Sequence, residues 1–180
     1  MTRPGMTRPG MTHPGMTHPG MTHPGMTRPR IELRVLDARL RDWGLPRFQT
    51  DMAAAVDLHA CLEAPLALAA GAAAVLIPSG IALSIGDAGI AALIVPRSGL
   101  GHKKGLVLGN SVGVIDADYQ GPVMISAWNR NPAGTAPIDI LPGERIAQML
   151  FVPVLRPEFL VTDQFSESTA RGAGGFGSTG

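Results

Sequence analysis

The chain has 180 residues, the length of one domain, and 45% of them are apolar while only 4% are aromatic, which predicts an aliphatic core. Its 15 basic and 14 acidic residues give a net charge of +1. Because residues 1–30 contain four arginines and no acid, residues 31–180 carry a balance of −3. That body excludes the class of basic nucleic-acid-binding domains, in which Lys and Arg cluster. The single cysteine, Cys61, excludes a disulfide framework within the chain and predicts a reducing compartment, the cytoplasm.

No segment of the sequence is apolar for long enough to predict a membrane span. The most apolar region, 66–95, is interrupted by four glycines, Pro78 and Asp87, and a spanning helix needs about 18 uninterrupted apolar residues. Residues 1–30 lack the apolar centre of a secretory signal. We therefore expect no membrane partner and no nucleic-acid partner.

Residues 1–30 repeat the five-residue unit Met-Thr-Arg/His-Pro-Gly six times, with a final arginine in place of glycine. A proline in every unit breaks helices and cannot donate to a sheet, so the repeat predicts a disordered tail. Three interpretations stay open. His13, His18 and His23 would bind a metal loosely, or the arginines would contact an anionic surface. The favoured interpretation is a short DNA repeat that expanded at the gene start, with the true start further in, for example at Met26.

From Ile31 onward, apolar stretches of four to eight residues alternate with Gly, Pro, Asp and Asn. Many of these stretches are β-branched and their spacing is typical of an all-β barrel or sandwich. The expected strands cover 31–36, 56–61, 73–77, 81–85, 91–95, 112–115, 123–128 and 145–152.

Two short segments favour helix within this β pattern. Residues 64–75 are rich in alanine, which has high helix propensity, although Pro65 and Gly71 interrupt them. Residues 87–92 would form a single helical turn with Asp87 as its N-cap. No long segment has the 3.6-residue period of an α/β fold.

The stretch 96–101 is the first with the composition of a binding site. An apolar strand runs directly into Arg97, Ser98 and Gly99. The guanidinium of Arg97 and the hydroxyl of Ser98 donate hydrogen bonds, and glycine at 99 and 101 lets backbone N–H groups approach an anion. This pattern suits a phosphate chain; a plain turn with a solvated arginine is the alternative.

The stretch 113–121 places an Asp-x-Asp-Tyr turn between two apolar strands, which predicts a β-hairpin. Asp116 and Asp118 lie on the same side of an extended chain, and a carboxylate held there would orient and deprotonate a water molecule. Tyr119 would stack on a sugar or base. The alternative is an ordinary hairpin turn, in which Asp and Gly are common.

Two further stretches lie towards the end of the chain. In 143–151, Gln148 alternates with apolar residues on one strand face, so its amide needs either backbone partners or a ligand. In 171–180, five glycines accompany Arg171, Phe176 and Ser178. One aromatic residue in such a polar run predicts a lid that orders over a ligand.

These stretches, in this order and at this spacing, resemble the five motifs of the trimeric dUTP diphosphatases (dUTPases) of the bacterial type. The resemblance extends over about residues 31–180, and the repeat tail has no counterpart in it. Motif one is 54–58, motif two 96–100, motif three 113–121 preceded by 108–110, motif four 143–148 and motif five 171–180.

The resemblance implies a fold, an assembly and a reaction. The fold is an all-β distorted jelly roll over 31–165, preceded by the disordered tail 1–30 and followed by a flexible C-terminal arm, 166–180. Three chains form a homotrimer with shared active sites, over which the arm closes. The reaction is hydrolysis of dUTP to dUMP and diphosphate by water attack at the α-phosphorus, which lowers dUTP and supplies dUMP for thymidylate synthesis.

The resemblance also implies roles for residues around the nucleoside. Asp116 would be the catalytic residue that orients the attacking water, and Tyr119 would pack under the deoxyribose and exclude a 2′-hydroxyl. The edge of uracil would be read by Asn110 and by backbone around Val114, Ile115 and Met124.

At the triphosphate, the implied contacts come from motifs two, four and five. Mg²⁺ would be held by phosphates and water with no direct protein ligand, since small hard cations prefer oxygen ligands. Asp57 would hydrogen-bond the waters of that metal, and Phe176 would cover the uracil. The implied phosphate contacts are Arg97, Ser98, Gly99, Gln148, Arg171 and Ser178.

Two alternatives remain at this point. A dCTP deaminase of the same superfamily needs a catalytic glutamate in the base pocket, but the sequence has no glutamate between Glu63 and Glu144. A non-catalytic trimer that binds nucleotide as a signal would not need Asp116, Arg97 and Arg171 together, so their presence favours an enzyme.

Overall fold

The computed structural model describes residues 28–174, which contain ten β-strands and two short helices. Residues 1–27 of the repeat, which are predicted to be disordered, lie outside the described residues, as do Phe176 and Ser178. Residues Ile31–Gly180 form one structural unit.

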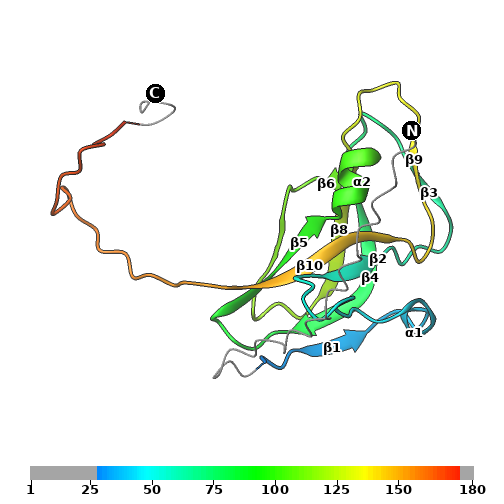
Figure 1. The fold of residues 1–180 in the computed structure, drawn as a ribbon, viewed down its shortest axis with the longest axis horizontal. Helices are drawn as coiled ribbons and strands as arrows, with labels where there is room; N and C mark the ends of the chain where they lie inside the picture. The colour runs from blue at the N-terminus through cyan, green and yellow to red at the C-terminus, as the bar shows by residue number, and fades with distance from the viewer. Residues whose placement is uncertain (1–27, 175–180) are drawn as a thin grey trace, which may run out of the picture. The chain divides into compact units, whose positions relative to one another are not determined.

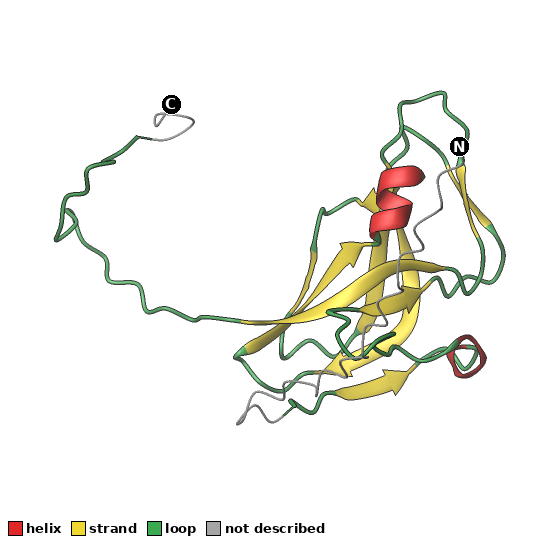
Figure 2. Ribbon diagram, viewed as in Figure 1, coloured by secondary structure: helices red, strands yellow, loops and turns green. Residues whose placement is uncertain are grey.

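Two four-stranded antiparallel sheets and one two-stranded sheet make up the fold (Figures 1 and 2). Sheet A has the order β1 (Glu32–Val35), β4 (Val75–Ser84), β8 (Pro122–Asn129), β6 (Leu106–Leu108). Sheet B has the order β2 (Val56–His59), β10 (Arg145–Pro153), β5 (Ile90–Pro96), β7 (Gly113–Ile115). The small sheet pairs β3 (Leu66–Leu68) with β9 (Ile138–Ile140), and the helices are α1 (Leu40–Trp43) and α2 (Ser98–Lys103).

The core lies between sheets A and B and is supplied by strand alternation. On β8, Val123, Ile125 and Ala127 are buried while the residues between them are more exposed. Buried aliphatic side chains of both sheets form one cluster, so the burial of apolar surface holds the sheets together. Two antiparallel sheets on one aliphatic core confirm the predicted all-β fold.

The helical turn predicted at 87–92 is wrong, because these residues form a tight turn into β5. The Asp87 carboxylate accepts a hydrogen bond from the Gly89 N–H at 2.8 Å, and the Ile90 N–H donates to the Asp87 carbonyl at 3.0 Å. Asp87 therefore closes an Asx turn, a role that competes with helix capping for the same side chain.

Tertiary pairing also overrides helix propensity in the alanine-rich segment. Residues 64–75 contain β3 and no helix, because β3 pairs with β9. The strands expected at 73–77 and 81–85 are a single strand, β4, whose register against β8 shifts between Pro78 and Ala82. Gly80 permits this shift, since its φ is +74° and a Cβ there would crowd Cys61 and Leu40.

The C-terminal end of the described chain differs from the sheets. Residues 154–174 contain no helix or strand, and Figure 2 draws them as loop. Several large apolar side chains in this segment are exposed by about nine-tenths, among them Leu155, Phe159, Leu160, Val161 and Phe165. Neither described helix is long and apolar enough to cross a membrane.

Candidate active site

A cavity of about 180 Å³ lies beside β7 and gathers residues from motif three. We name it the Tyr119 cavity after its aromatic wall. Its lining consists of Val114, Ile115, Asp116, Tyr119, Pro122 and Met124. Five of these six are residues that the sequence predicts as catalytic or substrate-binding, and the structure brings them together.

The Tyr119 ring is fixed by local contacts. Its hydroxyl donates to the Pro122 carbonyl at 3.0 Å, and its backbone N–H donates to the Asp116 carbonyl at 3.2 Å. A Cβ on Gly121 would lie 2.5 Å from the Tyr119 hydroxyl oxygen, so a larger residue at 121 would shift the ring from this position. The ring is therefore a preformed wall of the cavity.

The hairpin predicted around Asp116 is wrong. Strand β7 pairs with β5 in sheet B, whereas β8 pairs with β4 and β6 in sheet A. Residues 116–121 therefore connect the two sheets, which the sequence cannot distinguish from a hairpin because both connections are short and polar.

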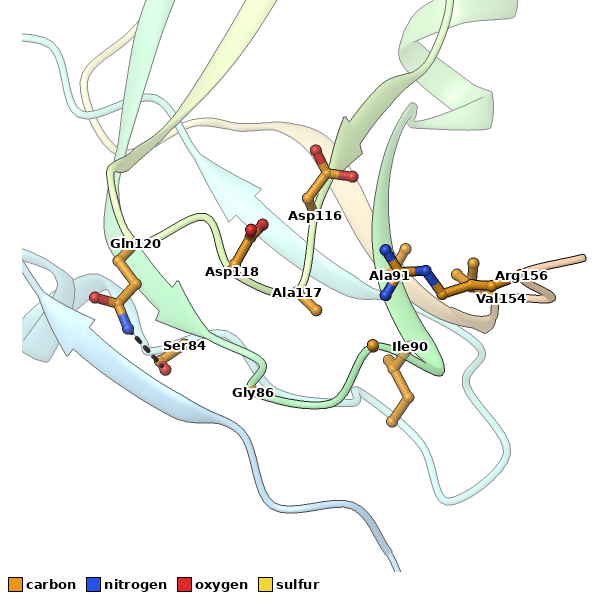
Figure 3. Close-up of a pocket in the computed structure, with 11 residues that line it drawn as sticks. Ser84, Gly86, Ile90, Ala91, Asp116, Ala117, Asp118, Gln120, Val154 and Arg156 are labelled. Carbon is orange, nitrogen blue, oxygen red and sulfur yellow. Dashed lines mark hydrogen bonds between the residues drawn. The ribbon is translucent and has the colours of Figure 1, made fainter. Parts of the chain in front are cut away.

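Asp116 also lines a second, larger concavity of about 780 Å³ (Figure 3). This concavity is bounded by the turn between β4 and β5, by the 116–120 connection and by Val154 and Arg156. Asp116 and Asp118 project to one side of the connection and Ala117 to the other. Within residues 28–174 Asp116 forms no ion pair, so its carboxylate is free to accept a proton from a bound water.

A cluster of charged residues occupies the other end of sheet B; we name it the Asp57 cluster (Asp57, Arg97 and Arg145). One carboxylate oxygen of Asp57 lies 2.8 Å from Nε of Arg97, and the other lies 3.0 Å from Nη1 of Arg145. Arg97 also donates from Nη1 to the Arg145 carbonyl at 2.9 Å. Two guanidinium groups share one carboxylate, so the Asp57 cluster has an excess of positive charge and unused N–H donors that suit an anion.

Arg145 also belongs to this cluster, although the sequence predicts no role for it. Its position inside motif four is the signal that could have identified it. Its partner Asp57 is 88 residues away in the sequence, so the ion pair itself follows only from the pairing of β10 with β2.

Ser98 and Gly99 follow Arg97 directly, at the start of α2. A Cβ built on Gly99 would meet nothing within 4 Å, so there is open space at this backbone. Gln148 faces Asp57 and Val95 in the sheet register, and its amide nitrogen donates to the Pro96 carbonyl at 3.0 Å. The amide of Gln148 is thus partly satisfied by backbone, one of the two alternatives left open for it.

Two predicted residues form part of neither group. Asn110 follows β6 in a turn whose next residue, Ser111, has a φ of +63°, and it does not line the Tyr119 cavity. Arg171 is exposed and donates from Nε to the Gly174 carbonyl at 2.9 Å, within its own segment.

His59 lies next to the Asp57 cluster on β2. It is buried, and its Nδ1 has no hydrogen-bond partner among the described residues. Burial lowers the pKa of His59, and the positive charge of Arg145 lowers it further. Burial also raises the pKa of the Cys61 thiol to about 12, which makes it a packing residue and a poor nucleophile.

The Tyr119 cavity and the Asp57 cluster are far apart within one chain. Ile115 lies opposite Ala92 in the register of β7 and β5, while Arg97 follows the far end of β5. At about 3.3 Å per strand residue, Asp116 and Arg97 are separated by about 20 Å along the sheet. One phosphate group could not contact both side chains of the same chain.

Groups of three or more His, Cys, Asp or Glu side chains that could hold a metal ion do not occur between residues 28 and 174. A hard cation such as Mg²⁺ needs about six oxygen ligands. Both oxygens of Asp57 already face guanidinium groups. The donor set therefore fits a metal that arrives with its own oxygen ligands.

The model of the dUTPase family matches residues 41–180. The deoxyuridine 5′-triphosphate nucleotidohydrolase of Paraburkholderia xenovorans (strain LB400) is 55% identical over 151 residues, which cover 84% of this chain and 98% of that protein. The enzyme of the same name from Burkholderia mallei (strain SAVP1) is 54% identical, also over 151 residues, 84% of this chain and 98% of that protein.

Among solved structures, a mutant of the Staphylococcus bacteriophage 80alpha dUTPase with dUpNHpp superposes with a TM-score of 0.72. It is 25% identical, and the match covers 84% of this chain and 98% of that one. A mutant of the dUTPase from phage phi11 of S. aureus, which coordinates a structural Mg(II) ion, superposes with a TM-score of 0.67. It is 23% identical, and the match covers 77% of this chain and 99% of that one.

Proposed function

The chain belongs to the dUTPase family, and we propose that the Tyr119 cavity and the Asp57 cluster divide the family's reaction between them. The protein is a dUTP diphosphatase, which hydrolyses dUTP to dUMP and diphosphate. The observation that carries the division is the position of Asp116 in the wall of a cavity of about 180 Å³, at the opposite end of sheet B from the guanidinium groups.

The Tyr119 cavity binds the nucleoside. Val114, Ile115 and Met124 surround the uracil, and Asn110 reads its edge from the neighbouring turn. The ring of Tyr119 packs under the deoxyribose, and its fixed position leaves no room for a 2′-hydroxyl. Asp116 orients the water that attacks the α-phosphorus and accepts its proton.

The Asp57 cluster binds the triphosphate. Arg97 offers the guanidinium donors that its bond to Asp57 leaves unused, and Ser98 and the open backbone of Gly99 approach the phosphate oxygens. Gln148 contacts the α-phosphate through the part of its amide that Pro96 does not occupy. These groups neutralise the phosphate charge equally in the bound substrate and in the departing diphosphate, so they contribute mainly to affinity.

The described residues offer no group of carboxylate, His or Cys ligands for a metal ion, so Mg²⁺ would be held by the phosphate oxygens of the substrate and by water. It would supply neutralisation of charge on those phosphate oxygens. Asp57 would accept hydrogen bonds from these waters while it holds Arg97 and Arg145 in place.

A complete site requires more than one copy of the chain, and the assembly we propose is a homotrimer. The separation of about 20 Å between Asp116 and Arg97 supports this, because the two ends of one sheet would serve two different substrates. The exposed apolar residues 155–165 support it too, since such side chains need a surface to cover them.

The proposed organisation places the β domain at 31–165 and the C-terminal arm at 166–180, in the cytoplasm, after the tail 1–30. In the arm, Arg171 and Ser178 contact the outer phosphates and Phe176 covers the uracil of a site on another copy. Closure of the arm would exclude water from the reacting phosphate.

Product analysis tests the function directly. Purified protein with Mg²⁺ is incubated separately with dUTP, dCTP, dTTP and UTP, and the products are resolved by anion exchange. We expect dUMP and diphosphate from dUTP alone. Conversion of dCTP would assign the chain to the deaminases, and dUTP binding without turnover would assign it to the regulatory trimers.

Mixed trimers test the division of the site. At dUTP concentrations well below KM, Asp116→Asn and Arg97→Gln are each expected to have little activity, but refolding the two variants together would place one intact Arg97 opposite one intact Asp116. About one in four sites of a random mixture would then be complete, so about a quarter of the wild-type activity returns. If the mixture stays inactive while its chains exchange, both residues must come from the same chain.

A further inference from the structure

The turn that precedes Arg145 has a defined geometry. Pro142 and Gly143 occupy its centre, the Glu144 N–H donates to the Leu141 carbonyl at 3.0 Å, and the φ of Gly143 is +78°. These are the features of a type II turn, with proline at the second position and glycine at the third. Two hydrogen bonds with Ala60 connect the turn to the end of β2. The Gly143 N–H donates to the Ala60 carbonyl at 2.9 Å, and the Ala60 N–H donates to the Glu144 carbonyl at 2.8 Å.

The indole ring of Trp43 covers this turn from α1. A Cβ built on Gly143 would lie 2.8 Å from Cε2 of Trp43 and 2.9 Å from its Cδ2, so the ring lies directly against the glycine backbone. Trp43, Gly143 and Arg145 also line one cavity of about 290 Å³ together with His59. The Trp43 and His59 ring centroids are 6.4 Å apart.

Trp43 is itself held by a second charged group, the Arg39 cluster (Asp37, Arg39 and Glu63). The Arg39 guanidinium carbon lies 5.0 Å from the centroid of the Trp43 ring, a cation–π distance. The same guanidinium binds Asp37 at 2.6 Å and Glu63 at 2.8 Å, and it donates to the Leu62 carbonyl at 3.0 Å. Arg39 therefore has little freedom, and it limits the movement of the ring.

The contact reaches the phosphate end of the site through one residue. Arg145 lies two residues after Gly143, so the conformation of the turn determines the position of the Arg145 backbone, from which its side chain extends. That side chain binds one oxygen of Asp57, and its carbonyl accepts a bond from Arg97. A shift of the turn would therefore change the spacing of both guanidinium groups.

We propose that Trp43 is a positioning residue for phosphate binding. Its ring packs against Gly143 and fixes the turn, and the turn determines the position of Arg145 and, through Asp57, of Arg97. The proposal rests on the proposed function for the identity of the bound anion, the phosphate chain of dUTP and the diphosphate product. It assigns no role to Trp43 at the Tyr119 cavity, so the chemical step is not affected.

The test separates binding from turnover. For Trp43→Ala we expect the KM for dUTP to rise about tenfold while kcat changes by less than about twofold. Inhibition by inorganic diphosphate should weaken by the same factor as KM rises, because diphosphate binds only at the phosphate end. Trp43→Phe keeps an aromatic face on Gly143 and should restore most of the affinity.

Two controls keep a structural effect distinct from a positioning effect. Trp128→Ala removes the other tryptophan, which lies on β8 of sheet A, and should leave KM unchanged even if it lowers the melting temperature. In an Arg145→Gln background, Trp43→Ala should raise KM by clearly less than it does in the wild type, since the side-chain bond to Asp57 is gone and only the carbonyl bond to Arg97 remains. The proposal would be overturned if the double variant raised KM by the product of the two single-variant factors. It would also be overturned if Trp43→Ala lowered the melting temperature but left KM unchanged.

Direct binding of diphosphate, measured by calorimetry, distinguishes failure of this proposal from failure of the proposed function. If the wild-type protein binds diphosphate but does not turn over dUTP, the function is wrong, and weaker binding by Trp43→Ala would still support the positioning role. If the wild type hydrolyses dUTP and Trp43→Ala binds diphosphate normally, the function stands and the positioning role is wrong.

Discussion

The Tyr119 cavity and the Asp57 cluster lie at opposite ends of sheet B, and their side chains are held in different ways. In the Tyr119 cavity, backbone and packing fix the aromatic ring, and the Asp116 carboxylate has no cationic partner within residues 28–174. In the Asp57 cluster, each carboxylate oxygen contacts one guanidinium group, and the guanidinium groups keep spare donors.

This difference explains how residues 31–180, which are mildly acidic, bind a strongly anionic substrate. Each end leaves one kind of group unsatisfied: a proton acceptor in the Tyr119 cavity and hydrogen-bond donors in the Asp57 cluster. Shape selects the nucleoside at one end and charge selects the phosphates at the other. Changes at the first end should therefore act on turnover, and changes at the second end should act on affinity.

The largest expected effect comes from Asp116→Asn. Asparagine keeps the shape of the side chain but cannot accept a proton, so kcat should fall about a thousandfold. The affinity for dUpNHpp should change by less than about threefold. Initial rates and calorimetry measure the two quantities. Asp118→Asn on the same connection is the matched control, with near-normal turnover; near-normal turnover of Asp116→Asn would remove it as the base.

Deletion of residues 171–180 should produce the next largest effect. It removes Arg171, Phe176 and Ser178 from the proposed lid, so kcat/KM should fall about a hundredfold. Light scattering should still find the proposed trimer, because the sheets and residues 154–170 remain. A monomeric product would instead make the arm part of the assembly rather than part of the site.

Asp57→Asn tests the other end of the comparison. The two guanidinium groups would lose the charge that draws them together, and we expect KM for dUTP to rise about tenfold with kcat within about twofold. Asp139→Asn on β9, which is exposed, controls for the loss of one negative charge. A large fall in kcat with unchanged KM would show that the two ends do not divide affinity from turnover.

The parts of the site that the sequence predicts are those made by contiguous residues. Val114, Ile115, Asp116, Tyr119 and Met124 fall within eleven positions of one another, and the structure places all five around one cavity. Most strands were predictable for the same local reason, since alternation and turn residues are visible in short windows.

The parts that the sequence did not predict depend on pairing between distant segments. The partnership of Arg145 with Asp57 follows from the register of β10 and β2, and β3 is a strand because β9 pairs with it. Whether 116–121 joins two strands of one sheet or two sheets depends on the partners of β7 and β8. Local propensity carries no information on any of these.

The smallest effect concerns the Arg39 cluster, an arginine–carboxylate group that lies outside both ends of the site. Its composition is the reverse of the Asp57 cluster, with two carboxylates for one guanidinium. Hydrogen bonds from Arg39 lower the pKa of Asp37 to about 2 from its usual 3.8. Because this folded pKa is below the unfolded one, the contribution to stability is complete above about pH 4 and is lost as the pH falls towards 2.

Asp37→Asn should therefore lower the free energy of unfolding at pH 7 by about 1 kcal/mol, since solvent screens the pair. The gap between wild type and variant should close between about pH 4 and pH 2, as urea unfolding at several pH values would measure. KM should change by less than about twofold, because Glu63 and the Leu62 carbonyl still hold Arg39 over Trp43. A difference in the free energy of unfolding that persists at pH 2 would mean that Asp37 stabilises the fold by packing rather than by charge. A tenfold rise in KM would instead make the Arg39 cluster as important for phosphate binding as the Asp57 cluster.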